Sequence, residues 1–181
     1  MAVPVRLAAL AFAFCLLFPA GARAQGATEY EIKAAYLYRF LSFIDWPEDG
    51  AAGTSTPFVI GVLGAPDVGD ALTQIAAGKM ARGRPVEVRR LAANDPVAGI
   101  QMLFVGQAAS ARIGALARAA PPGQLMVSES SGALDQGSAV DFRIENGRVR
   151  FAVSLPAVQR AGLRISSRML SVALEVRGER P

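Results

Sequence analysis

The chain has 181 residues, of which 52% are hydrophobic and 19% charged, and its formal net charge is +4. This length suffices for one domain whose core folds without disulfides or metals. One cysteine and no histidine are present, which excludes Ser-His and Cys-His triads, histidine-ligated metals and imidazole acid–base catalysis.

The first 24 residues have the pattern of a secretory signal peptide. Arg6 supplies a positive charge, residues 7–18 are apolar, and residues 22–24 read Ala-Arg-Ala, an A-x-A cleavage pattern. The apolar run is too short to span a bilayer. We therefore expect cleavage after Ala24 and export, to the periplasm in a bacterium with two membranes.

The mature domain, residues 25–181, would then lack cysteine. Cys15 lies inside the apolar run and follows Phe14 where a lipoprotein signal needs a small residue, so lipidation is not expected. Basic and acidic residues are interspersed, with no basic run beyond Arg89-Arg90, so nucleic acid is not an expected partner. No second apolar stretch is long enough to span a membrane.

The first half of the mature domain shows helix and strand patterns in turn. A helix is expected over residues 29–46, with acidic residues in its first turn and Pro47 as its stop. Residues 58–63 are a continuous apolar run, typical of a strand covered on both faces. A second helix is expected over residues 66–78. Apolar and polar residues alternate over residues 85–91, which is typical of a more exposed strand.

The alternation of strands and helices continues through the middle of the chain. Residues 102–105 predict a second fully buried strand. Ser110 is a candidate N-cap for a helix that Pro121 and Pro122 would stop. Residues 124–127 predict a third core strand.

The C-terminal part predicts a hairpin and two helices. Apolar and polar residues alternate over residues 139–144 and 148–153, on either side of Asn146-Gly147, which is a strong hairpin signal. Residues 156–161 and 167–176 are expected to be short helices. The fold class is therefore a single three-layer α/β domain, with a mostly parallel sheet flanked by helices, a C-terminal antiparallel hairpin and two short terminal helices.

The first helix carries three candidate binding residues. Lys33 falls in the middle of the apolar arc of this helix, so it must snorkel, pair with a carboxylate or contact an anionic ligand. Arg39 lies on the opposite face. Trp46, the only tryptophan, ends the expected helix and either fills the core or stacks on a ligand or partner.

The C-terminal segment adds arginines. Arg160, Arg164 and Arg168 lie close in sequence to Ser166-Ser167. Arginines can bind an anion in a bidentate manner, or they can be solvated charges beside a capped helix. The candidate ligand or partner surface consists of Lys33, Arg39, Trp46, Arg164 and Arg168.

No catalytic constellation is recognisable. The serines of residues 128–131 lack an activating base, and Asp135, Asp141 and Glu145 lack a spacing that favours paired catalysis. Gly61-x-x-Gly64 matches neither nucleotide-binding glycine motif, so a tight turn is the favoured interpretation. We expect no enzyme activity, no cofactor and no metal.

Four motifs follow one another in a recognisable order along the chain. Residues 29–40, read as EYEIKAAYLYRF, precede Trp46-Pro47, the apolar segments 58–64 and 102–106 follow, and residues 161–170 read AGLRISSRML. In this order, the motifs resemble the YfiR-like family of periplasmic proteins. The family's Phe-Glu-Ile-Asn motif is replaced by residues 151–154, Phe-Ala-Val-Ser, and the disulfides of the family's best-known member have no counterpart in the expected mature chain.

The resemblance implies a non-enzymatic regulator that binds and represses an inner-membrane signalling protein, expected to be a diguanylate cyclase, and so lowers cyclic-di-GMP. It also implies a homodimer and an outer-membrane lipoprotein that releases the repressed partner. Two alternatives stay open. One is a periplasmic small-molecule-binding sensor module that uses the candidate residues, and the other is a hydrolase that uses carboxylates alone.

Overall fold

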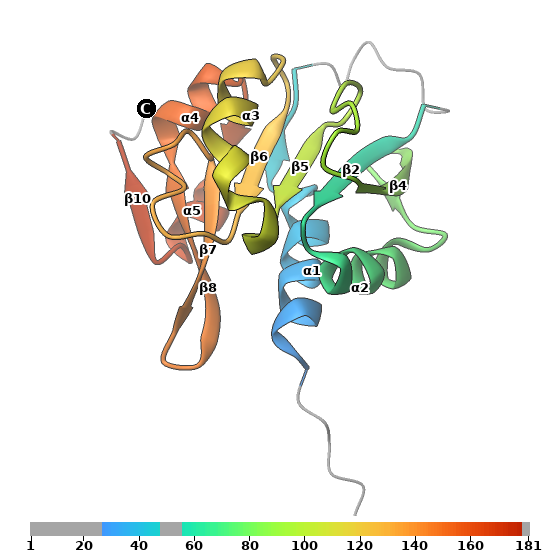
Figure 1. Ribbon diagram of the computed structural model, residues 1–181, viewed down its shortest axis with the longest axis horizontal. Helices are drawn as coiled ribbons and strands as arrows, with labels where there is room; N and C mark the ends of the chain where they lie inside the picture. The colour runs from blue at the N-terminus through green and yellow to red at the C-terminus, as the bar shows by residue number, and fades with distance from the viewer. Residues whose placement is uncertain (1–26, 48–55, 179–181) are drawn as a thin grey trace, which may run out of the picture.

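The computed structural model describes residues 27–47 and 56–178 (Figure 1). The expected signal peptide at residues 1–24, its cleavage site and Cys15 lie outside the described residues. Within the described part of the chain, no helix is long and apolar enough to cross a membrane.

The centre of the domain is an eight-stranded sheet (Figure 1). Its strands are β2 (Phe58–Leu63), β3 (Met80–Ala81), β4 (Arg84–Leu91), β5 (Met102–Val105), β6 (Leu125–Ser128), β7 (Val140–Glu145), β8 (Arg148–Ser154) and β10 (Glu175–Arg177). They lie in the order β10-β8-β7-β6-β5-β2-β4-β3. Neighbours run parallel, except that β7–β8 and β3–β4 are antiparallel.

Helices cover both faces of this sheet. They are α1 (Glu29–Phe40), α2 (Pro66–Ala76), the 3-10 helix η1 (Gln107–Arg112), α3 (Ile113–Ala119), α4 (Leu155–Arg160) and α5 (Ser167–Ser171). One buried cluster joins α1, α2, α4 and α5 to one face of the sheet, and a second cluster joins η1 and α3 to the other face. The expected three-layer α/β domain with a mostly parallel sheet is thereby confirmed.

The larger core is built around aromatic rings. Tyr36 and Phe40 of α1 pack on Phe142 of β7 and Phe151 of β8, with ring centroids 5.2 to 5.9 Å apart. Such stacked, tilted and edge-on contacts add to the hydrophobic gain of burial. They hold α1 against the antiparallel end of the sheet.

The helix expected over residues 29–46 is too long. It ends at Phe40, and Ile44–Asp45 forms the short strand β1, which pairs antiparallel with β9 (Arg164–Ile165). Ile44 is fully buried in this pairing, so its apolar side chain continues the hydrophobic pattern although the helix has ended. A contact with a segment distant in sequence overrides the helical periodicity here.

Two further expectations are corrected. The helix expected over residues 167–176 ends at Ser171, and Glu175–Arg177 is the edge strand β10, parallel to β8. Ser110 lies inside η1 and does not cap α3, whose N-cap residue is Arg112. In contrast, the Asn146-Gly147 turn joins β7 and β8 as expected, with positive φ at both residues.

Candidate functional site

The ribbon formed by β1 and β9 joins the two motif segments at the ends of the domain. Ile44 pairs with Ile165 and Asp45 with Arg164. The backbone N–H of Ser166 donates to the carbonyl of Phe43 at 2.9 Å. The segment that ends the first motif is therefore fixed beside the last motif, and together they form one surface.

Trp46 supports this ribbon from the core. It follows β1, is 6% exposed, and packs edge-on against Phe58 of β2 with ring centroids 4.8 Å apart. Its buried Nε1 donor has no hydrogen-bond partner among the described residues. The indole ring fills core space in this structure, so the stacking role expected as one alternative remains a prediction.

An apolar pocket of about 570 Å³ lies beside the ribbon, within the usual size range of small-molecule sites. α4 lines it with Leu155, Val158 and Gln159, and the remaining wall comes from residues 162–165 and from α5. Arg164 is exposed at this pocket. The arrangement suits an apolar group that carries a negative charge.

Two of the candidate arginines, Arg39 and Arg168, are exposed on two different helices. Arg168 lies in the first turn of α5, where Ser166 Oγ caps the helix by accepting from the N–H of Met169 at 3.4 Å. Arg39 lies in the last turn of α1. Neither side chain forms an ion pair with another described residue. The structure thus places Trp46 and Arg164 together, with Arg168 on the helix that begins directly after the ribbon.

Lys33 does not belong to that surface. Its side chain is buried, and Nζ lies 2.5 Å from Glu129 Oε2 and 2.5 Å from Glu29 Oε1. Burial acts to lower the pKa of Lys33, but the hydrogen bonds and charges of Glu129 and Glu29 outweigh it and raise the pKa. Of the three roles expected for Lys33, the structure contains the carboxylate pairing.

A charged cavity of about 680 Å³ surrounds this pairing. Asp141 lines it and is 1% exposed, and its burial raises the pKa of the carboxyl, although hydrogen bonds from Ser128 and Arg143 act to lower it. Arg143 also pairs with Glu175 of β10 at 2.6 Å. Within residues 27–47 and 56–178, no acidic, cysteine or histidine cluster could hold a metal ion.

The crevice that ligands often occupy in open α/β sheets is closed in this chain. Strand order reverses between β2 and β5, the usual place for such a site. After these strands, a Cβ on Gly106 would lie 2.5 Å from the carbonyl oxygen of Gly64, and a Cβ on Gly64 would lie 2.7 Å from Ala109. Backbone packing fills this position, and Gly64 also has a positive φ, which agrees with the tight-turn interpretation.

Comparison with known proteins adds a family and a fold. The sequence profile of the YfiR/HmsC-like family matches residues 30–174. No curated protein sequence matches the chain. Among solved structures, a conserved domain protein from Vibrio cholerae O1 biovar El Tor has a TM-score of 0.55 at 10% identity.

That alignment covers 82% of this chain and 60% of the Vibrio cholerae protein, so the chain spans less than two thirds of its length. The ABC domain in complex with L-Trp from Streptococcus pneumonia has a TM-score of 0.49 at 11% identity, with 66% and 55% of the two chains covered. At these identities, the likeness to the Vibrio cholerae protein concerns the fold alone.

Proposed function

Because the chain belongs to the YfiR/HmsC-like family, we propose that it is a periplasmic, non-enzymatic regulator that binds and represses a membrane-bound diguanylate cyclase, thereby lowering cyclic-di-GMP. The family match over residues 30–174 is the observation that carries the proposal. The signal-peptide pattern of residues 1–24 and the absence of histidine support it.

The surface proposed for the partner is the β1–β9 ribbon with its neighbouring pocket. An apolar side chain of the cyclase sensor region enters the pocket lined by Leu155 and Val158, and acidic groups face Arg164 and Arg168. Buried apolar anchors supply most of the affinity of such interfaces, whereas charges at the rim direct encounter and orientation. Repression follows if this surface binds the inactive state of the cyclase more tightly than the active state.

The experiment is deletion of the gene combined with co-purification. We expect cyclic-di-GMP to rise in the deletion strain and to return when the gene is supplied in trans. We also expect the tagged protein to retain a membrane protein that carries a diguanylate cyclase domain. Unchanged cyclic-di-GMP together with no retained cyclase would contradict the proposal.

A second candidate function is a periplasmic small-molecule sensor, which the 570 Å³ apolar pocket beside Arg164 favours. A ligand that binds only the folded state raises the melting temperature by mass action. Thermal unfolding with nucleotides and amino acids tests this function. A rise in melting temperature that disappears when Val158 is replaced by a larger side chain would support the sensor function. An unchanged melting temperature with every compound would contradict it.

A further inference from the structure

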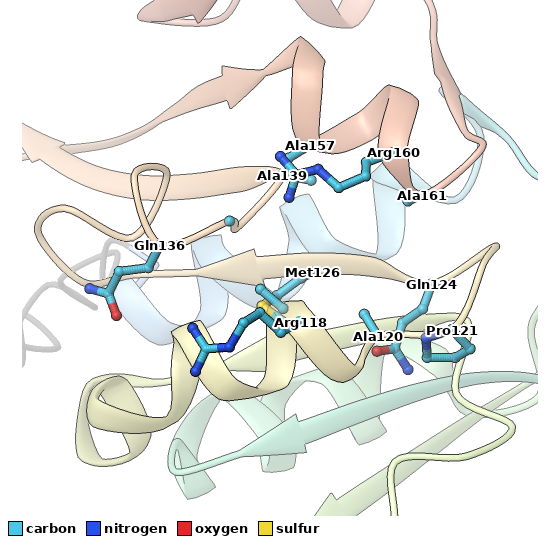
Figure 2. A pocket seen from close by; sticks show the side chains of 12 residues that line it. Arg118, Ala120, Pro121, Gln124, Met126, Gln136, Ala139, Ala157, Arg160 and Ala161 are labelled. Atoms are coloured by element: carbon cyan, nitrogen blue, oxygen red, sulfur yellow. The ribbon is translucent and has the colours of Figure 1, made fainter.

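A second pocket, separate from the ribbon, lies between α3 and α4 on β6 (Figure 2). Its volume is about 430 Å³, enough for a small organic molecule. The space exists because half of the residues that line it are small: Ala117, Ala120, Gly137, Ala139, Ala157 and Ala161. Met126 adds an apolar, adaptable surface from β6 (Figure 2).

Two arginines from different elements flank this pocket. Arg118 belongs to α3 and Arg160 to α4, and Figure 2 shows both guanidinium groups at the pocket. In the described part of the chain, neither guanidinium group forms an ion pair or a hydrogen bond. No described Asp or Glu lines the pocket. Two cations without counter-charges, on helices that cover opposite faces of the sheet, attract an anion, and each guanidinium can bind a carboxylate in a bidentate manner.

A buried hydrogen-bond acceptor lies at the other end of the pocket. Gln124 is 2% exposed, and its Nε2 donates to the carbonyls of Ile100 at 2.9 Å and Val97 at 3.2 Å. These bonds determine the orientation of the amide. Oε1 is left without a partner among the described residues and points to the Ala120 side (Figure 2). A buried acceptor without a donor is unfavourable, and a ligand N–H or O–H would supply one.

We infer that this pocket binds a small organic anion. Its carboxylate lies between Arg118 and Arg160, its apolar body lies over Met126 and the alanines, and a donor group faces Gln124. This inference does not depend on the proposed partner. The two pockets nevertheless share one helix, because α4 contributes Ala157 and Arg160 to this pocket and Val158 to the pocket beside the ribbon.

The test uses a matched set of probes on the protein purified from the periplasm. 4-Hydroxybenzoate combines carboxylate, apolar ring and donor, 4-hydroxybenzamide lacks the charge, and inorganic phosphate lacks the apolar body. By calorimetry, we expect 4-hydroxybenzoate to bind with a Kd of about 1 mM or below, and the other two to bind at least about tenfold more weakly.

Substitution of the two flanking arginines tests whether 4-hydroxybenzoate binds in this pocket. Arg118→Ala and Arg160→Ala should each weaken 4-hydroxybenzoate binding by roughly tenfold, the usual effect of removing one charged hydrogen-bonding group. Arg148→Ala, at the exposed hairpin turn, is the matched control and should bind like the wild type. Unchanged melting temperatures show that the variants remain folded.

Three results would overturn the inference. The first is the absence of saturable 4-hydroxybenzoate binding up to about 20 mM, far above the expected Kd. The others are an equal affinity for 4-hydroxybenzamide, and a loss of affinity in the Arg118 and Arg160 variants that is no larger than in the Arg148 control. Tighter binding of phosphate than of 4-hydroxybenzoate would overturn the assignment of an organic anion.

Discussion

Lys33 Nζ on α1 lies 2.5 Å from Oε2 of Glu129, the residue that follows β6. The other carboxylate oxygen of Glu129 accepts the backbone N–H of Gln107 at 2.9 Å, at the start of η1. This one pair therefore ties elements from both faces of the sheet to the end of a central strand. The side chains of Lys33 and Glu129 are 9% and 12% exposed, whereas that of Glu29, the second partner of Lys33, is 55% exposed.

Lys33→Met should destabilise the domain by about 2–4 kcal/mol, because it leaves Glu129 partly buried without its counter-charge. Glu29→Gln should cost about 0–1 kcal/mol, as is usual for an exposed ion pair. Urea unfolding followed by circular dichroism measures both. The double variant Lys33→Met with Glu129→Gln should recover much of the loss, and failure of the Lys33 variant to lose stability would contradict a structural role.

The buried carboxyl of Asp141 predicts a pH dependence of opposite sign to that of an ordinary ion pair. Its pKa is raised above the unfolded value of 3.8, so the folded state holds this proton more tightly than the unfolded state does. Through this group, the free energy of unfolding falls as pH rises from the unfolded pKa through the folded pKa. Asp141→Asn removes this contribution.

The variant should therefore gain stability relative to the wild type as pH rises through that window. Unfolding titrations of both proteins between pH 3 and 7 measure the difference. Arg143 and Ser128 face Asp141, so Arg143→Met serves as a companion variant that should raise the pKa of Asp141 further. A difference between wild type and Asp141→Asn that stays constant with pH would contradict the shifted pKa.

Buried parallel strands were the most predictable part of the fold. The apolar runs at residues 58–63 and 102–105 coincide with β2 and β5. A strand covered on both faces is an uninterrupted apolar run, so the sequence shows where it begins and ends. The end of α1 was not predictable in the same way. Ile44 is as apolar as a helix residue of the core face, and only its pairing with Ile165 makes it a strand.

The sites depend still more on contacts between distant segments. Sequence showed that Lys33 needs a partner or ligand, but nothing near it in the chain identifies Glu129. The pocket between Arg118 and Arg160 was missed, because its wall comes from α3, α4 and the loop at residues 136–137. Its one local signal is Arg118 among the alanines of α3, a pattern that is also typical of a solvated helix face.

Trp46→Phe should cost little stability, about 1 kcal/mol, because the indole N–H has no hydrogen-bond partner to lose among the described residues and a phenyl ring keeps the contact with Phe58. Trp46→Ala should cost about 3–5 kcal/mol, since it leaves a large cavity beside β2. Thermal unfolding by circular dichroism compares the two. Equal losses in both variants would mean that the indole nitrogen makes a bond that a phenyl ring cannot replace.

Charge reversal at the ribbon tests the proposed partner surface. Arg164→Glu combined with Arg168→Glu should weaken binding to the cyclase sensor region at least about tenfold, since like charges would then meet at the interface. Both side chains are exposed, so the melting temperature should change little. Arg148→Glu, which reverses one exposed charge at the hairpin turn between β7 and β8, is the control for the single variants Arg164→Glu and Arg168→Glu. Equal weakening by Arg148→Glu would assign the effect to net charge, and unaltered binding of the double variant would place the partner on another face.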